Sequence, residues 1–246
     1  MQLKYPHSRL TTRLDAVLGL SDADRGLIGK LPFTIRNFAA DQDLVRAGEG
    51  ASECWLLLDG YLYRHKETSD GRRQILSIYV PGDIPDLASL YLARADHTLG
   101  ALGPAVAAHV PHGPLQDLMT ASPTLMRALQ RETLVDAAIF REWILNIGTR
   151  QAVSRVAHLL CEIATRLQIV GLAKDLSFTL PMSQADIGEA TGISTVHANR
   201  VIQDLRSRGA IEWRNKTLKI LDWDALVSIA DFSPAYLHLR DDARES

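Results

Sequence analysis

Hydrophobic positions in the first half of the chain fall in short runs separated by turn residues. Residues 53–65 (ECWLLLDGYLYRH) and 72–83 (RRQILSIYVPGD) are strongly apolar, and turn pairs such as Asp59-Gly60 and Pro81-Gly82 interrupt the pattern. Short β-prone runs with turn signals about ten residues apart are typical of antiparallel sandwiches and barrels. We therefore predict a compact β domain over residues 33–110.

The pattern becomes helical after Pro114. Ser122 is a plausible N-cap, Pro123 suits the first helical position, and no further Gly or Pro occurs before Gly148. Apolar positions three and four residues apart form a seam, with polar interruptions at Thr133 and Asp136. We expect this seam to face the same helix of a second copy, through Met126, Leu129, Thr133, Phe140, Trp143 and Ile147. A second stripe, formed by Leu134, Ala138 and Leu145, is expected to pack on the β domain. Burial of the whole helix within one chain is the alternative.

A pair of short helices is predicted near residue 190. A helix over 150–170 and a short strand around Phe178 precede them. Ser183 can cap a helix that runs to Ala190, Gly192 allows a left-handed turn, and Ser194 can cap a helix that runs to about Arg208. Gly188 is small where two such helices cross closely. This arrangement is a helix-turn-helix, with a buried face formed by Ile187, Ile193, Ala198, Val201 and Leu205.

The remaining residues of the second helix point outward near its N-terminus. Polar side chains there can donate to phosphates or contact base edges in the major groove. A predicted hairpin follows, with a turn at Asn215-Lys216, and its basic residues Arg214, Lys216 and Lys219 would lie near the DNA backbone as a wing. We predict that DNA is bound by Ser183, Gln184, Ser194, Thr195, Val196, His197, Asn199, Arg200, Gln203 and Lys216.

Charge and composition agree with this prediction. Residues 150–220 carry ten Lys or Arg against six Asp or Glu, whereas the whole chain has a net charge of −2. Cys54 and Cys161 lie far apart without neighbouring metal ligands, and no apolar run resembles a signal peptide or a membrane span. We expect a cytoplasmic protein with reduced thiols and no membrane partner.

The chain resembles the cyclic-AMP receptor protein / fumarate-nitrate regulator (Crp/Fnr) superfamily of bacterial transcription factors. The resemblance covers residues 20–225 and rests on the motifs PGDIPDLASL and GISTVHANRVIQDLRSRGAI. It implies an α+β fold with three parts: N-terminal helices and a β-roll over 1–121, a dimerisation helix over 122–148, and a winged helix over 149–246. It also implies a homodimer, a palindromic DNA site and RNA polymerase as a partner.

The ligand cassette departs from the cyclic-AMP-binding pattern of the family. Gly-Glu and Arg-Ser pairs are replaced by Pro85-Asp86 and His97-Thr98, and the Thr-Ser pair of the dimer helix is replaced by Phe140-Arg141. The arginine that grips the cyclic phosphate is missing, and Arg94 could replace it only in a rebuilt loop. We therefore expect no dependence on cyclic AMP.

Other family sensors leave no clear trace in the sequence. Iron-sulfur members carry a cluster of N-terminal cysteines, whereas no cysteine precedes Cys54 here. Haem binding would need an axial ligand, for which His97, His109 and His112 are candidates. We expect no cofactor and no metal, and the sensory signal stays open, including regulation by protein abundance alone.

The recognition helix also differs from the familiar one. Relatives that bind the best-known half-site present Arg, Glu and Arg, and the matching positions here carry Thr195, Val196 and Arg200. Arg200 can still contact guanine O6 and N7 together, while Val196 can touch a thymine methyl group. We predict a different half-site.

Two other function classes compete with a DNA-binding regulator. One is an interaction module of the same fold that has lost DNA binding, which Val196 and the modest positive charge would permit. The other is a cupin-like metal enzyme that uses His97, His109 and His112, although the chain lacks the expected His-X-His pair.

Overall fold

The computed structural model describes residues 5–239 and divides into two compact units. Among the described residues, the first unit contains 5–66, 78–138 and 238–239, and the second contains 67–77 and 139–237. The boundary between the two units falls within the long helix, between residues 138 and 139, and the domain boundaries expected at 122 and 148 stay a prediction. The predicted α+β fold class is confirmed.

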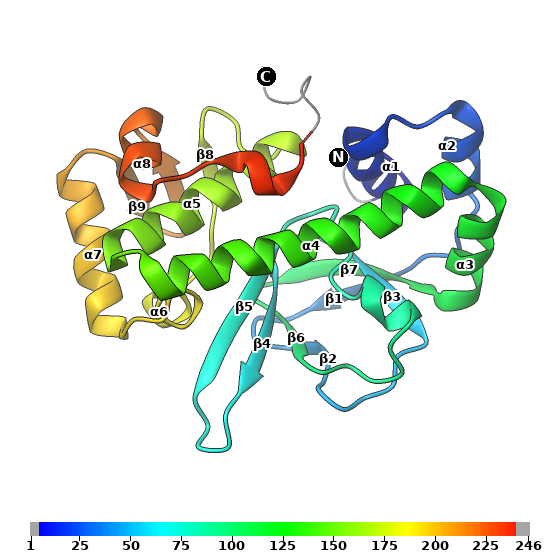
Figure 1. Ribbon diagram of the computed structural model, residues 1–246, viewed down its shortest axis with the longest axis horizontal. Coiled ribbons are helices and arrows are strands. Elements are labelled where there is room, and N and C mark those ends of the chain that lie inside the picture. The colour runs from blue at the N-terminus through cyan, green and yellow to red at the C-terminus, as the bar shows by residue number, and fades with distance from the viewer. Residues whose placement is uncertain (1–4, 240–246) are drawn as a thin grey trace. The chain divides into compact units, whose positions relative to one another are not determined.

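The first unit consists of two antiparallel sheets and a layer of helices (Figure 1). The strand orders are β1-β7-β3 and β2-β6-β4-β5. The strands are β1 (Thr34–Phe38), β2 (Asp43–Val45), β3 (Glu53–Asp59), β4 (Leu62–Glu67), β5 (Arg73–Tyr79), β6 (Thr98–Ala101) and β7 (Ala105–Pro111), although residues 73–77 of β5 are assigned to the second unit. The helices are α1 (Pro6–Leu18), α2 (Asp22–Ile28), the 3-10 helix η1 (Leu87–Leu90), α3 (His112–Ala121) and the first part of α4 (Pro123–Thr149).

Strand β3 shows why the apolar runs of the first unit are continuous. Successive side chains of a strand point to opposite faces of the sheet. Cys54 and Leu56 enter a cluster with the helices, whereas Trp55 and Leu57 enter a second cluster between the two sheets. Because both faces of β3 are covered, the alternation of polar and apolar residues is lost, as for any strand buried on both sides.

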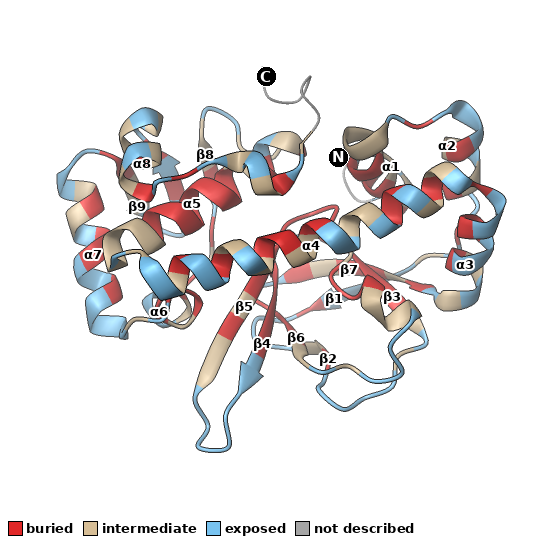
Figure 2. Ribbon diagram, in the orientation of Figure 1, coloured by how far each residue is buried: buried red, intermediate tan, exposed pale blue. Residues whose placement is uncertain are grey.

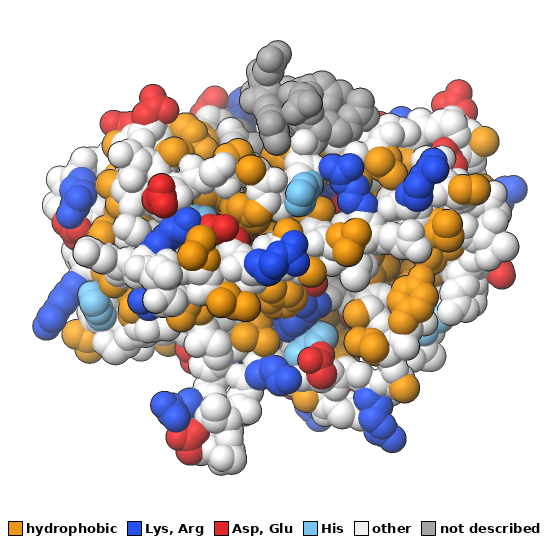
Figure 3. Space-filling model, in the orientation of Figure 1, with side chains coloured by type: hydrophobic (Ala, Val, Ile, Leu, Met, Phe, Trp, Pro, Cys, Tyr) orange, Lys and Arg blue, Asp and Glu red, His pale blue; other side chains and the backbone are white. Residues whose placement is uncertain are grey.

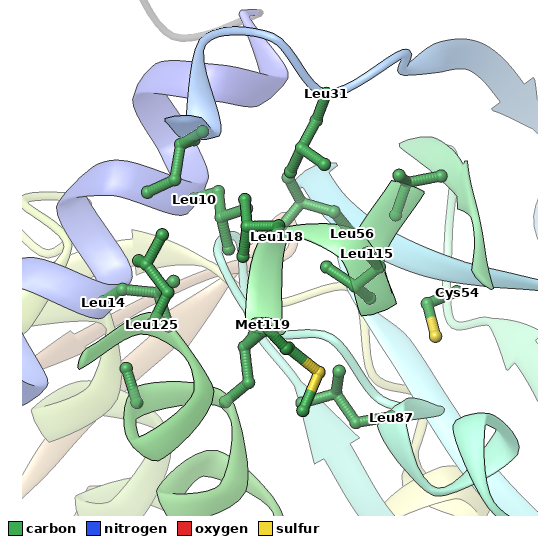
Figure 4. Packing of buried hydrophobic residues seen from close by; sticks show 14 of the residues in the cluster. Leu10, Leu14, Leu31, Cys54, Leu56, Leu87, Leu115, Leu118, Met119 and Leu125 are labelled. Carbon is green, nitrogen blue, oxygen red and sulfur yellow. The ribbon is translucent and has the colours of Figure 1, made fainter. Parts of the chain in front are cut away.

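The cluster between helices and sheet is formed by leucines from distant parts of the chain. In Figure 4, Leu10 and Leu14 of α1 meet Leu118 of α3 and Leu125 of α4. Leu10, Leu14 and Leu125 are at most 1% exposed. Ser122 caps α4 as predicted, because its hydroxyl accepts a hydrogen bond from the amide of Leu125.

The second unit holds the C-terminal helices and a small sheet of strand order β8-β10-β9. The helix over residues 223–230 was not predicted from the sequence, although the Asp222 side chain caps it by accepting a hydrogen bond from the amide of Ala225. The elements are α5 (Ala152–Ile169), β8 (Ser177–Thr179), α6 (Gln184–Thr191), α7 (Thr195–Ser207), β9 (Ile211–Arg214), β10 (Thr217–Ile220), α8 (Trp223–Ala230) and the 3-10 helix η2 (Pro234–Leu237). Within residues 5–239, no helix is long and apolar enough to cross a membrane.

Helix α4 turns a different face outward from the one predicted. Leu129 and Trp143 of the predicted seam are only 2% and 5% exposed within a single chain. The outward face carries Gln130, Leu134, Arg141, Ile144 and Gly148, which are exposed, and Ala137, which is half-buried; each lies one residue after a seam position. One residue corresponds to a rotation of about 100° around a helix. Buried and exposed residues alternate along α4 in Figure 2 with this periodicity.

Candidate DNA-binding interface

Helix α6 begins with a reciprocal cap. The Ser183 hydroxyl accepts a hydrogen bond from the amide of Asp186 at 3.2 Å, and the Asp186 carboxylate accepts one from the amide of Ser183 at 2.8 Å. Two of the amide groups that a helix start leaves unpaired are thus satisfied. This capping box confirms the predicted start of the first helix and leaves the side chains of Ser183 and Gln184 at the surface.

Two glycines set the geometry between α6 and α7. Gly192 has a φ of 67° and ends α6 in the left-handed conformation. A Cβ atom on Gly188 would lie 2.6 Å from the carbonyl oxygen of Ile193, closer than real Cβ contacts allow. The tight crossing of the two helices therefore requires glycine at position 188, as the sequence predicted.

Helix α7 has one buried and one exposed face. Ser194 caps it by accepting a hydrogen bond from the His197 amide at 3.3 Å. Ala198, Val201 and Leu205 are at most 5% exposed and pack inward, as predicted. The opposite face is accessible: Ser183, Gln184, Ser194, Thr195, Val196, His197, Asn199, Arg200, Gln203 and Lys216 are all exposed.

The outward face of α7 borders a shallow groove of about 630 Å³ beside the start of α5. Ser194, Val196, His197 and Arg200 line it from α7. The structure therefore brings together four of the predicted DNA-binding residues. Sequence reasoning did not anticipate the opposite wall, which is formed by Gln151, Ala152 and Val153.

Arg200 is available for an external partner. In the part of the chain that the structure describes, its guanidinium has no hydrogen bond or ion pair. Asp204, four residues further along the helix, instead pairs with Arg208 at 2.8 Å. An internal Arg200–Asp204 pair, the simplest alternative to a DNA contact, is absent.

The hairpin after α7 has the form of a wing. Strands β9 and β10 pair antiparallel, and β8 adds a third strand along β10. Asn215 and Lys216 have φ values of 50° and 64°, which is the conformation of a two-residue type I′ turn. Lys216 lies at the exposed tip of this turn. Arg214, by contrast, pairs with Glu212 at 3.0 Å and is less available.

Family models match the two halves of the chain separately. The cyclic nucleotide-binding domain matches residues 35–122, and the Crp-like helix-turn-helix domain matches residues 154–229. The chain belongs to the Crp/Fnr family of transcription regulators. The predicted resemblance is thus confirmed, and with it a DNA-binding regulator rather than an enzyme.

Curated Crp/Fnr relatives cover most of the chain at low identity. The transcriptional activator protein FnrA of Stutzerimonas stutzeri is 25% identical over 189 residues, which are 77% of each chain. The nitrogen fixation regulation protein FixK of Bradyrhizobium diazoefficiens is 25% identical over 186 residues, 76% of this chain and 77% of the relative. Among solved structures, FixK2 from Bradyrhizobium japonicum has a TM-score of 0.74 at 23% identity, covering 82% of this chain and all of that one.

An internal arginine occupies the cassette region of this Crp/Fnr protein. Arg64 of β4 is only 6% exposed and donates to the Asp136 carboxylate of α4 at 2.9 Å. It also donates to the carbonyl of Pro85, and its guanidinium lies 5.3 Å from the ring centre of Tyr79. The Tyr79 hydroxyl is 3.2 Å from the other Asp136 oxygen. Arg64 and Tyr79 were missed in the sequence, where the only signal was Asp136 as a polar interruption of the helix seam.

The other predicted cassette residues are divided between buried and exposed positions. Asp86 is 5% exposed, accepts a hydrogen bond from the amide of Trp55 at 2.9 Å, and has its pKa raised to about 7, chiefly by burial. The His97 imidazole is 2.7 Å from the Asp96 carboxylate, and burial lowers the pKa of His97. Thr98, half-buried, accepts from the amide of Ala47 at 3.3 Å. Phe140 is half-buried and Arg141 is exposed.

Arg94 does not replace the missing arginine. It is exposed and donates to the carbonyl of Gly48 at 2.8 Å.

Two of the histidines that are candidate metal or haem ligands have separate partners: His109 lies 2.7 Å from Glu53, and His112 lies 2.9 Å from Ser89. Within residues 5–239, no three His, Cys, Asp or Glu side chains are grouped as a metal site.

A buried polar cluster explains why Trp143 faces inward. Its indole donates to the Glu162 carboxylate at 3.0 Å, and the Tyr236 hydroxyl donates to the same oxygen at 2.8 Å. Arg166 donates to the other Glu162 oxygen at 3.2 Å. Burial raises the pKa of Glu162, which is fully enclosed. Trp143 and Leu129 therefore cannot serve in a subunit seam, which corrects that part of the prediction.

The remaining seam residues differ in their surroundings. Met126 packs against the cluster of the first unit, and a side chain at Gly192 would come within 3.3 Å of Ile147. Thr133 is exposed. Figure 3 shows hydrophobic side chains exposed over the course of α4 with basic side chains among them. Leu134 and Ile144 are 69% and 72% exposed.

Proposed function

We propose that this protein is a homodimeric, sequence-specific DNA-binding regulator that recognises a palindromic site without cyclic AMP. The observation that carries the proposal is the exposed face of α7, where Arg200 has no partner among the described residues. A free, forked donor beside a helix N-terminus is suited to guanine in the major groove. The names of relatives, such as transcriptional activator, support RNA polymerase as a further partner and a cytoplasmic location.

The proposal assigns different tasks to α7 and to the wing. Arg200 would specify a base pair, whereas Lys216 at the tip of the hairpin would meet only phosphate. Selection of bound sequences from a random DNA pool tests this directly. Wild type should select a palindrome with half-sites about one helical turn apart, since a two-fold dimer presents two recognition helices.

Two variants separate specificity from affinity. Arg200→Ala should lose about 1–3 kcal/mol of binding free energy and relax the preference at one base pair of each half-site. Lys216→Ala should weaken binding to every sequence alike and lower the salt slope by about one per subunit. Identical preference profiles for wild type and Arg200→Ala would remove Arg200 from the set of specifying residues. Absence of any salt-dependent DNA binding by wild type would instead favour an interaction module.

The α4 stripe supports a subunit interface one residue further along the helix than the predicted seam. Gln130, Leu134, Ala137, Arg141, Ile144 and Gly148 repeat at spacings of four and three residues, which is the pattern of a helix-helix seam. Leu134 and Ile144 are exposed on the same face of the helix, and contiguous exposed apolar surface marks sites of protein–protein contact. We therefore place the two-fold contact on this stripe.

The internal partner of Arg64 supports independence from cyclic AMP. The guanidinium already bridges β4 and α4 through Asp136, in the region where the cassette residues were predicted. A cyclic phosphate would need a free cation there, and the Arg64 charge is already neutralised. The signal to which the protein responds is left open by this proposal.

A further inference from the structure

A chain segment outside the helix-turn-helix contacts α6. Residues 67–77, which comprise the end of β4, the turn after it and most of β5, belong to the second unit although they lie within the residues matched by the cyclic nucleotide-binding model. The Arg73 Nε donates to the Glu189 carboxylate at 2.6 Å, and a terminal nitrogen of Arg73 lies 3.4 Å from the Asp186 carboxylate. Gln74 donates to the carbonyl of Glu189.

The carboxylates held by Arg73 are the only charged side chains of α6. The helix sequence, QADIGEAT, contains Asp186 and Glu189 and no basic residue. Asp186 also forms the capping box with Ser183, at the end of α6 where Ser183 and Gln184 are exposed. In a helix-turn-helix, the first helix crosses the DNA backbone. Without Arg73, α6 would therefore bring two negative charges towards phosphates.

We propose that Arg73 is a positioning residue for DNA binding, which neutralises the α6 carboxylates and holds Asp186 in its capping geometry. This inference rests on the proposed DNA-binding function. The arginine fork spans both carboxylates, whose side chains are 14% and 28% exposed, so the pair is less screened than a pair at the open surface. Arg73 itself is 25% exposed and acts through Glu189 and Asp186 rather than through DNA.

The test measures the affinity and salt slope of binding to a fluorescein-labelled duplex that carries the sequence selected by wild type. Arg73→Gln should weaken binding roughly three- to ten-fold, the size expected for a partly exposed charge interaction, without changing the salt slope by a full unit. Glu189→Gln added to Arg73→Gln should recover part of the lost affinity, because one of the two repelling charges is gone. Arg72→Gln is the matched control, since the Arg72 side chain is 81% exposed and pairs with Asp70 rather than with α6.

Each result decides the matter. Unchanged affinity of Arg73→Gln would overturn the proposal. A loss that Glu189→Gln does not repair, together with a salt slope lower by about one per subunit, would show that Arg73 contacts phosphate directly and would also overturn it. If Arg73→Gln proves unfolded, Arg73→Lys keeps the charge but loses the fork that spans both carboxylates, so it should lose less than about three-fold in affinity; a loss of about ten-fold would count against neutralisation. Failure of wild type to select any DNA would contradict the proposed function instead.

Discussion

At the scale of single residues, burial rather than residue type decides how the acidic groups behave. Asp86 and Glu162 are 5% and 0% exposed, and burial raises the pKa of each. Arg64 and Arg166 lie close enough to oppose that shift. An Asp or Glu next to an Arg is usually a surface pair of little consequence, whereas these enclosed groups link pH to stability.

Asp86 should make the first unit less stable as pH rises. Its folded pKa of about 7 is above the ordinary value of 3.8, so the folded state binds the proton more tightly between these values. Stability from this group is complete below about pH 4 and is lost as pH rises through 7. Asp86→Asn should remove this pH dependence of stability. Between the unfolded and folded pKa values, the difference in unfolding free energy between wild type and variant should change by about 1.4 kcal/mol per pH unit. Urea unfolding at several pH values measures this free energy for both proteins. If it changes with pH in the same way in wild type and Asp86→Asn, the raised pKa of Asp86 is not the cause.

Trp143 should contribute to stability rather than to dimer formation. Trp143→Phe removes the donor to Glu162 and leaves a buried acceptor with fewer partners, so unfolding free energy should fall by about 1–3 kcal/mol. Sedimentation of the folded variant should give the same mass as wild type. A change in mass at unchanged stability would return Trp143 to the subunit interface.

At the scale of elements, close contacts decide which face of α4 points outward and how closely α6 and α7 cross. On α4, packing buries Trp143 and leaves Ile144 at the surface. The crossing of α6 and α7 brings the backbone of Gly188 so close to the Ile193 carbonyl that no side chain fits at position 188.

Ile144→Glu should convert dimers to monomers. Ile144 is 72% exposed in one chain, so a glutamate there is tolerated by the monomer but places two like charges at a two-fold seam. Sedimentation velocity should show half the mass, with a melting curve that reports folded protein. Ile35→Glu, at a 48% exposed position on β1, is the control and should leave the mass unchanged. Dimers of Ile144→Glu would show that the interface lies elsewhere.

Gly188→Ala should abolish DNA binding. The added methyl group would lie 2.6 Å from the Ile193 carbonyl, so α6 and α7 must move apart by backbone shifts. A mobility shift with the selected duplex should show no complex, and the melting temperature should fall. Gly26→Ala in α2 has nothing within 4 Å and should be neutral or stabilising by about 0.5–1 kcal/mol. Wild-type affinity in Gly188→Ala would contradict the close crossing.

At the scale of the whole molecule, two separately packed units share one continuous helix, and each has its own polar link to it. Arg64 bonds to α4 within the first unit, while Trp143 of α4 bonds to Glu162 within the second. Neither link requires a small ligand. The family fold is thus retained, while its cassette region is closed by the chain's own arginine.

Cyclic AMP should leave the whole protein unchanged. A ligand at 100 times its Kd adds about 2.7 kcal/mol of stability, which corresponds to several degrees in melting temperature. At millimolar cyclic AMP, we expect no shift in melting temperature and no change in DNA affinity. Stabilisation by several degrees would mean that Arg64 releases Asp136 to admit the nucleotide, and Arg64→Met would then abolish that shift.

The sequence by itself determined the features whose signals are local. Ser122, Ser183 and Ser194 cap helices, because each cap bonds to an amide within three residues. The turn at Asn215-Lys216 likewise depends on the backbone preferences of two residues, and the family motifs lie in these same local segments. The helix-turn-helix, its wing and the exposed face of α7 could therefore be predicted without coordinates.

The tertiary structure decided the features that join distant positions. Arg64 is 72 residues from Asp136 and Arg73 is 116 residues from Glu189, and such pairs leave no periodicity in the chain. The outward face of α4 was also decided there, since a shift of one residue rotates a helix by about 100° and apolar residues occur on both sides. Packing against α5 and the leucine cluster, rather than the apolar pattern alone, determines which side of α4 is left for a partner.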